Sequence, residues 1–370
     1  MRLVVIKNMD PVTTVSYSCY ILQLLEEVLF ERGYRIVQAG TRFPESNSIT
    51  KDPDQLIILT IPAELTLGLS WWLDIQLPIF AKKFHAEKAI FLNGLTSKTL
   101  KIPQLMVISD ISYLKTKKNT GEKWQMHSRR TIRKSLEKAR LVLTYTEQAG
   151  TFLVNEFGAG AAKIRVLYRS KSPHLQNVKN IAEKTMIRQK YSEGREYFLL
   201  LHDGTLNDLL VVLKSFSVFK KWQKSNMKLL ISSNQESADP AFTAKLSAYR
   251  YREDVEIIND PAHQLHQELM SAAYAVICFY KTEGHLKYII ESMQSEVPVL
   301  ATKLPGIVEL CGEAAMYLEE PIPEKLGKQL IEIFKQEDYR GKLIQKGLLA
   351  LKKYDYRKAR EEIGAILSEN

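Results

Sequence analysis

Two glutamates with seven residues between them, Glu283 and Glu291, are the side chains of this sequence best suited to binding chemistry. Gly284 follows the first of them. The apolar run at 275–279 and the amphipathic pattern at 286–293 predict a strand, a loop and a helix that begins directly after the loop. Backbone N–H groups at such a helix start favour a phosphate, and the two carboxylates can accept hydrogen bonds from sugar hydroxyls. A diphosphate flanked by two polyhydroxylated rings is the outline of a nucleotide sugar.

The motifs of several other enzyme classes are absent from the sequence. There is no GxxxxGK[ST] phosphate loop, no HExxH, no GxSxG, and no GxGxxG after the first predicted strand, where the residues 8–14 read NMDPVTT. The seven histidines are scattered, and none pairs with a cysteine or carboxylate at ligand spacing. These absences argue against a P-loop enzyme, a zinc enzyme, a serine hydrolase and a dehydrogenase, and we expect no metal site.

The elements that position these residues follow from an alternation of strand and helix patterns that runs twice along the chain. Strands are predicted at 3–6, 34–38, 56–60, 89–92, 104–109, 141–145 and 164–168 and, after a polar stretch at 170–194, at 197–201, 228–232, 255–258, 275–279 and 298–301. Helices are predicted at 17–32, 206–221, 241–250, 263–273 and 286–293, and Pro78 predicts a kink or a break in a helix at 70–84. Two rounds of alternation predict an α/β protein with two doubly wound parallel sheets.

The order of the motifs resembles that of the retaining GT-B glycosyltransferases of the family-four type, the glycosyltransferase group 1 superfamily. Their hallmark is E-G-F-G-L-P-x-x-E, followed by G-x-P-V-V-A and G-x-x-E. Glu283, Gly284 and Glu291 match the first motif, the residues 297–301 (VPVLA) match the second, and 305–309 (PGIVE) match the third loosely. In the first half, the segments 108–114, 143–148 and 163–167 are similar to three further elements of the family.

The resemblance implies the GT-B fold, in which two Rossmann-like domains face a cleft. We expect an acceptor-binding domain at 1–180, a nucleotide-sugar-binding domain at 190–354, and a C-terminal helix at 355–370 that packs back on the first domain. The implied activity is transfer of a hexose-type sugar, with retention at the anomeric carbon, from a UDP- or GDP-linked donor to a glycan or glycolipid acceptor. Polysaccharide biosynthesis is the implied setting, and the nucleotide sugar is a co-substrate, with no resident cofactor.

The resemblance also assigns roles to individual residues. Glu291 would hold the nucleotide ribose and Glu283 the donor sugar, and Glu283 and Asp110 are the catalytic candidates. The predicted donor-binding set is Glu291, Gly284, His285, Leu286, Gly204 and Thr205. Lys281 and Lys287 are candidates for cations on the diphosphate. Asp110, which follows a predicted strand, has a helix-capping role as its alternative.

The sequence departs from the family where the diphosphate would bind. The family places an Arg and a Lys there, whereas no Arg or Lys lies between Tyr197 and Val212, and Asn207 stands at the Lys position. The residues 285–288 (HLKY) also replace the family's F-G-L-P. One alternative is therefore a catalytically degenerate GT-B-fold scaffold that partners an active glycosyltransferase. Another is a sugar-nucleotide epimerase or an inverting transferase, with Asp110 as the candidate base.

Positive charge is concentrated in the first half of the chain. The protein carries 52 Lys and Arg against 42 Asp and Glu, and the residues 1–190 alone hold 29 basic against 16 acidic side chains. Ten of the basic residues lie between Lys115 and Arg140. Such a region attracts phosphates or an anionic membrane, although a solvated helix face is the alternative. Nucleic acid is not expected, since few aromatic residues and no recognition motif accompany the charge.

Cysteine content and apolar runs indicate the compartment. Cys19, Cys278 and Cys311 are odd in number and far apart, which argues against a disulfide scaffold and fits a reducing compartment. No stretch reaches 18 uninterrupted apolar residues, and the apolar run within the residues 1–7 is too short for a signal peptide. We expect a cytoplasmic protein, with a peripheral position on the inner face of the plasma membrane as a further expectation.

Overall fold

The computed structural model describes the chain as two compact units. One consists of Met1–Arg169 together with Arg357–Asn370, and the other of Ser170–Tyr356. Within them the structure describes residues 2–6, 17–40, 56–60, 71–92, 94–108, 111, 114, 129–170, 180–202, 206–233, 240–260, 265–279 and 286–369. Each unit is an α/β layer structure around a parallel sheet, and each is described by itself.

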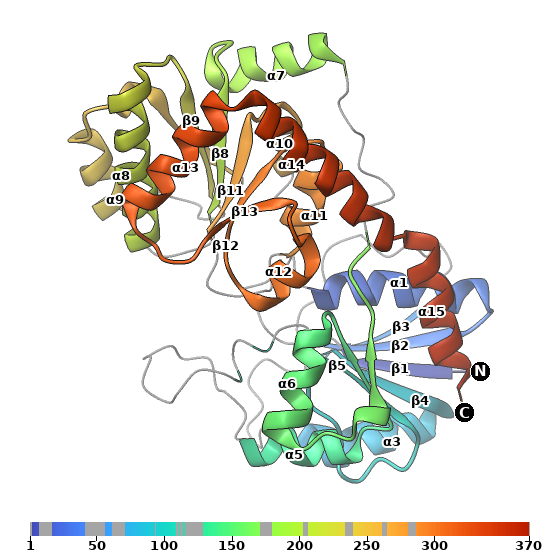
Figure 1. Ribbon diagram of the computed structural model, residues 1–370. Coiled ribbons are helices and arrows are strands. Elements are labelled where there is room, and N and C mark those ends of the chain that lie inside the picture. The colour runs from blue at the N-terminus through green and yellow to red at the C-terminus, as the bar shows by residue number, and fades with distance from the viewer. Residues whose placement is uncertain are drawn as a thin grey trace. The chain divides into compact units, whose positions relative to one another are not determined.

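The first unit is built on a seven-stranded parallel sheet of order β3-β2-β1-β4-β5-β6-β7. Its strands are β1 (Arg2–Ile6), β2 (Arg35–Gly40), β3 (Leu56–Thr60), β4 (Ala86–Phe91), β5 (Gln104–Ile108), β6 (Leu141–Thr144) and β7 (Ile164–Val166). The near-continuous apolar sequences of β1, β3, β5 and β6 suit a sheet that is covered on both faces. Figure 1 shows α1 (Tyr17–Glu31) and α15 (Tyr356–Ser368) on one face, and α3 (Leu77–Lys83) and α5 (Arg129–Lys138) on the other.

Local sequence signals explain where the helices of this unit begin and end. Helix α6 (Glu147–Phe157) is capped by the Thr146 hydroxyl, which accepts a hydrogen bond from the Ala149 N–H at 3.1 Å, and it ends at Gly158 with φ +71°. The segment with Pro78 is helical without a break, and its helix type changes directly before the proline. A π-helical turn, η1 (Trp72–Gln76), leads directly into α3, where Pro78 occupies the first turn. A short 3-10 turn, η2 (Ala161–Lys163), precedes β7.

Helix α15, at the end of the chain, belongs to the first unit. Arg32, just after α1, donates hydrogen bonds to the Gly364 carbonyl at 2.7 Å and to the Ser368 hydroxyl at 2.9 Å. Lys88 of β4 donates to the carbonyls of Leu367 and Glu369 at 2.5 and 2.9 Å. These cations meet the last carbonyls of α15, where the negative end of the helix dipole favours positive charge.

The second unit has a six-stranded parallel sheet of order β10-β9-β8-β11-β12-β13. Its strands are β8 (Tyr197–His202), β9 (Lys228–Ser233), β10 (Val255–Asn259), β11 (Ala275–Cys278), β12 (Val299–Thr302) and β13 (Ala315–Leu318). Its helices are α7 (Ile181–Ser192), α8 (Leu206–Gln223), α9 (Pro240–Ser247), η3 (Arg252–Asp254), α10 (His266–Ala272), α11 (Leu286–Gln294), α12 (Pro305–Cys311), α13 (Pro323–Lys335), α14 (Glu337–Ala350) and η5 (Leu351–Lys353).

The division between the units falls earlier than the sequence-based boundary at 180–190, because helix α7 belongs to the second unit. Arg188 donates a hydrogen bond to the Ala272 carbonyl at 3.1 Å, and the Tyr191 hydroxyl donates to Glu268 at 3.0 Å. Most of α7 is polar and exposed, and these polar contacts attach it to α10. A segment that lacks an apolar face resembles a linker in the sequence, which is why the predicted second domain began too late.

Gly327 is required for the close packing of α13 on α8. A Cβ at this position would lie 2.6 Å from Val218 Cβ and 3.0 Å from the Ser215 carbonyl oxygen, so Gly327→Ala forces the two helices apart. Overpacking of this kind costs about 1–3 kcal/mol, which outweighs the gain of about 1 kcal/mol in helix propensity. We expect a lower urea midpoint. Gly341→Ala on α14, where a Cβ meets no atom within 4 Å, should raise it; a rise for both variants would contradict this packing argument.

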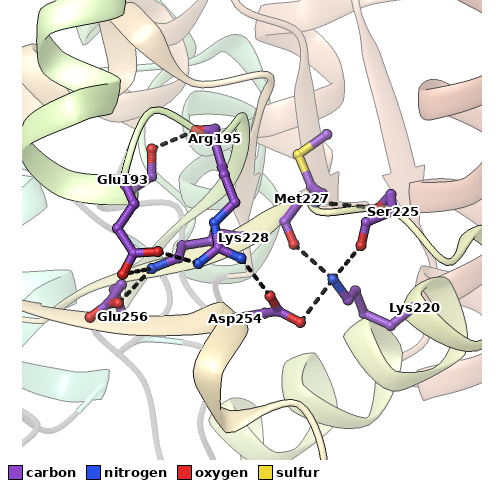
Figure 2. A network of polar contacts seen from close by, with 9 residues as sticks. Glu193, Arg195, Lys220, Ser225, Met227, Lys228, Asp254 and Glu256 are labelled. Atoms are coloured by element: carbon purple, nitrogen blue, oxygen red, sulfur yellow. Dashed lines mark hydrogen bonds and ion pairs between the residues drawn. The ribbon is translucent and has the colours of Figure 1, made fainter.

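A network of charged side chains lies at the amino ends of β8, β9 and β10 (Figure 2). Asp254 accepts a hydrogen bond from Arg195 at 2.9 Å and pairs with Lys220 at 2.8 Å. Lys220 also donates to the carbonyls of Ser225 and Met227 at 2.5 and 3.3 Å. In the same network the buried Lys228 pairs with Glu256 at 2.8 Å and with Glu193 at 3.1 Å. The network joins α7, α8 and η3 to the sheet at the edge opposite the predicted site.

Candidate functional site

The order of the second sheet reverses between β8 and β11, which are neighbours through pairs such as Leu200↔Ile277. The strand that comes first in the sequence of this unit thus lies beside the fourth. In open α/β sheets, ligands bind beyond the carboxyl ends of the strands at such a reversal. The strand ends in question are His202 and Cys278, and the helices that follow them along the chain are α8 and α11.

Apart from Asp110, which follows β5 along the chain of the first unit, the predicted site residues cluster along the sequence at these two strand ends. Seven of them lie outside the described residues: Asp110, Gly204, Thr205, Lys281, Glu283, Gly284 and His285. Leu286, Lys287 and Glu291 are described, and all three belong to α11, which begins at Leu286 as the sequence predicts. The structure therefore brings together the helical part of the predicted donor-binding set.

Glu291 is a buried carboxylate with 3% of its surface exposed. It is therefore not an ordinary solvated carboxylate on a helix surface. Lys287, one helical turn earlier and partly exposed, places its ammonium nitrogen 3.7 Å from Glu291 Oε1. A buried carboxylate is costly unless it has a cation or hydrogen-bond donors near it, and Lys287 is one such partner. Leu286 is also buried, so its side chain packs inside the protein at the start of the helix.

A buried polar cluster that the sequence did not predict lies between α10 and α11. Asp260, directly after β10, accepts a hydrogen bond from the Leu265 N–H at 2.9 Å, and its carboxylate lies 3.8 Å from His266 Nε2. The His266 ring meets the edge of Tyr288 with a centroid distance of 4.8 Å. Ser292 Oγ lies 3.3 Å from Met270 Sδ, which joins the same two helices. The cluster fixes the first turn of α11. An Asp at a strand end followed six residues later by a His in a helix was its signal.

The first turn of α8 contains a buried acid, Asp208. In the sequence this carboxylate looks unfavourable beside a diphosphate. In the structure it lies in the first turn of an 18-residue helix, where the positive end of the helix dipole favours negative charge. Among the described residues, no group of three or more His, Cys, Asp or Glu side chains could hold a metal ion.

Comparisons with solved structures match this arrangement over the whole chain. WaaG, described as a glycosyltransferase involved in lipopolysaccharide biosynthesis, superposes with a TM-score of 0.76 at 14% identity, with 100% of both chains covered. Anabaena Alr3699/HepE, solved in complex with UDP and glucose, gives 0.76 at 12% identity, again with 100% of both chains covered. The chain has the GT-B fold. Sucrose-phosphate synthase from Thermosynechococcus elongatus gives 0.72 at 16% identity over 99% of this chain and 98% of that chain.

Sequence comparison reaches less far. No protein-family model matches the GT-B chain. A Xenopus tropicalis protein, glycosyltransferase 1 domain-containing protein 1, is 23% identical over 175 residues, which are 46% of this chain and 50% of the frog protein. The match thus spans about half the length of that curated relative. The predicted α/β class with two doubly wound parallel sheets is confirmed, as is the resemblance to GT-B glycosyltransferases at the level of fold. None of the described helices has the length and apolarity needed to cross a membrane.

Proposed function

We propose that this GT-B protein transfers a hexose-type sugar from a UDP- or GDP-linked donor to a glycan or glycolipid acceptor with retention of anomeric configuration. The observation that carries the proposal is the buried Glu291 on the helix that follows β11, at the reversal of the second sheet. HepE, which shares the fold, was solved with UDP, with UDP and glucose, and with UDP-glucose, which supports a nucleotide sugar as ligand.

In this reaction the acceptor hydroxyl oxygen forms a bond to the anomeric carbon while the bond from that carbon to the diphosphate breaks, and the hydroxyl proton passes to the leaving diphosphate oxygen. The leaving diphosphate keeps the electron pair, so catalysis consists of positioning and stabilisation of its charge. We assign the ribose hydroxyls to Glu291 and the donor sugar to Glu283, with Asp110 as the second catalytic candidate. Gly204, Thr205 and the residues 284–286 complete the donor-binding set.

The proposal is tested by calorimetric titration of the protein with UDP, GDP, ADP, CMP and their common sugar conjugates. We expect saturable binding of one nucleotide class, with UDP or GDP as the ligand. NMR of the product anomer then tests retention, because an inverting transferase gives the opposite anomer. Absence of binding to every nucleotide would overturn the proposal.

Lys287 supplies a separate prediction about the diphosphate. Because the segment between Tyr197 and Val212 carries no Arg or Lys, we expect Lys287→Gln to weaken UDP binding about tenfold and uridine binding hardly at all. Lys221→Gln, on the exposed end of α8, is the matched control and should change neither affinity. Equal loss for UDP and uridine would mean that Lys287 acts on the nucleoside or only through Glu291.

The absence of Arg and Lys between Tyr197 and Val212 favours one alternative function. In this alternative the protein is a GT-B-fold scaffold that keeps the binding site and has lost the transfer reaction. It predicts nucleotide affinity without turnover, or no affinity at all. Incubation with donor and acceptor mixtures, followed by measurement of released nucleoside diphosphate, separates the scaffold from the transferase.

We also propose that the first unit attaches to an anionic membrane surface, which would bring the protein to a lipid-linked acceptor. The support is an excess of positive charge in that unit, since Met1–Arg169 and Arg357–Asn370 together hold 27 basic against 18 acidic side chains.

A further inference from the structure

We infer that the outer face of η1 and α3 is the surface of the first unit that docks on anionic lipid. Ile75 and Ile79 would enter the headgroup region, and Lys82 and Lys83 would contact lipid phosphates. This inference rests on the membrane attachment proposed above and does not depend on the transfer reaction.

The apolar part of this face is a pair of isoleucines held out to solvent. Ile75 and Ile79 are 47% and 57% exposed, and a spacing of four residues places them on one side of the helical segment. The opposite side is buried, with Trp72, Leu73, Leu77 and Ala81 packed into the unit. The helical segment is therefore fixed by its inner side, and its outer side has no role in the core.

The charged part of the face surrounds this pair. Lys82 and Lys83 are exposed in the last turn of α3, one turn beyond Ile79. Lys98, more than half exposed, pairs with Asp74 at 3.3 Å, so this nearest carboxylate of the segment is already neutralised. Apolar side chains rimmed by lysines are typical of helices that lie in the membrane interface and bind anionic lipid.

The face is also rigid. The Asp74 carboxylate accepts the Lys98 N–H at 2.7 Å, the Thr99 hydroxyl donates to the Asp74 carbonyl, and Ser97 Oγ lies 3.4 Å from Asp74 Oδ1. The same loop joins α5, because the Thr96 N–H donates to the Ser135 hydroxyl at 3.2 Å. A preformed face loses little conformational entropy when it binds.

A lipid surface fits this face better than a second copy of the chain. A stable protein interface buries about 800 Å² on each partner, far more than two half-exposed isoleucines provide. A symmetric dimer through this face would also bring Lys82 and Lys83 of one chain close to the same lysines of the other, where like charges repel. Reversible attachment to lipid, in contrast, needs only a small apolar insertion together with several cations.

Vesicle flotation tests the inference. One set of vesicles consists of phosphatidylcholine alone, and the other also contains about 30% of the anionic lipid phosphatidylglycerol, which gives a negative surface potential. We expect binding to the anionic vesicles only, decreasing as salt rises. Ile75→Ser with Ile79→Ser should lower the partition coefficient about tenfold or more. Lys82→Gln with Lys83→Gln should lower it about fivefold per lysine.

The matched control is Ile181→Ser with Met186→Ser, which removes two apolar side chains that are 82% and 71% exposed on α7 of the other unit. It should bind vesicles like the wild type, and all variants should keep the wild-type melting temperature. Unchanged flotation of the Ile75/Ile79 variant would overturn the inference, as would equal binding to neutral vesicles. Loss of a concentration-dependent dimer in that variant, measured by sedimentation, would instead assign the face to self-association. Nucleotide titration of the same variant reports separately on the proposed function.

Discussion

Asp254→Ala is expected to lower the free energy of unfolding by about 3 kcal/mol, the cost of breaking a buried ion pair by removing one partner. One carboxylate oxygen of Asp254 accepts a hydrogen bond from Arg195 at 2.9 Å, and the other pairs with the Lys220 ammonium at 2.8 Å. The side chain of Lys220 is only 6% exposed, so its ammonium group would stay inside the protein with two carbonyl oxygens and no counter-charge. Urea denaturation followed by circular dichroism measures the change.

Glu253→Ala is the matched control for this variant. Glu253 is the preceding residue, its side chain is 84% exposed, and it pairs with Arg252 at the surface. Exposed pairs contribute little, so we expect a change of less than about 1 kcal/mol. Similar losses for the two variants would show that the network of Figure 2 does not stabilise the second unit through Asp254.

Glu291→Gln is expected to weaken binding of the nucleotide about ten- to a hundredfold, the range for a hydrogen bond to a charged group that is lost in a buried site. Glutamine keeps the shape of the side chain and one carbonyl oxygen, so the helix stays packed while the charge disappears. Calorimetric titration with UDP and with uridine measures the effect, and both ligands should lose affinity because both carry the ribose.

The control for the charge is Glu332→Gln on the exposed side of α13. It removes the same charge from the same unit and should leave the UDP affinity unchanged. If Glu291→Gln lowers the melting temperature but binds UDP like the wild type, then Glu291 serves only as the buried partner of Lys287, and the assignment to ribose is wrong.

The sequence predicted the regular elements well because their signals are local. Gly33, with φ +71°, follows α1 as the residue that ends the predicted helix, and the helix predicted at 286–293 is α11 with one residue more. Pro78 correctly marked an irregular helix, because the helix type changes from π to α at Leu77, directly before the proline. Strand patterns such as 275–279 were equally clear, since a strand that is buried on both faces of a parallel sheet forms a near-continuous apolar run.

Features that depend on distant residues were not predicted. Helix α7 is attached to α10 by polar contacts, and nothing in its own sequence indicates that partner. The contact of the His266 ring with Tyr288 depends on how α10 packs against α11, which spacing along the chain does not reveal. The burial of Glu291 has the same origin, because α11 is covered by neighbours from other parts of the chain. The roles of the predicted site residues stay predictions.

The return of α15 to the first unit has a consequence for biosynthesis. Arg32 and Gly364, which are joined by a hydrogen bond, lie 332 positions apart, so the first unit cannot be completed until the whole second unit has been translated. At about 5–20 residues per second, that delay is on the order of 10–40 s. During that time the surface of α1 and β4 that receives α15 is open on the ribosome. The N-terminal part of the chain thus emerges first but is completed last.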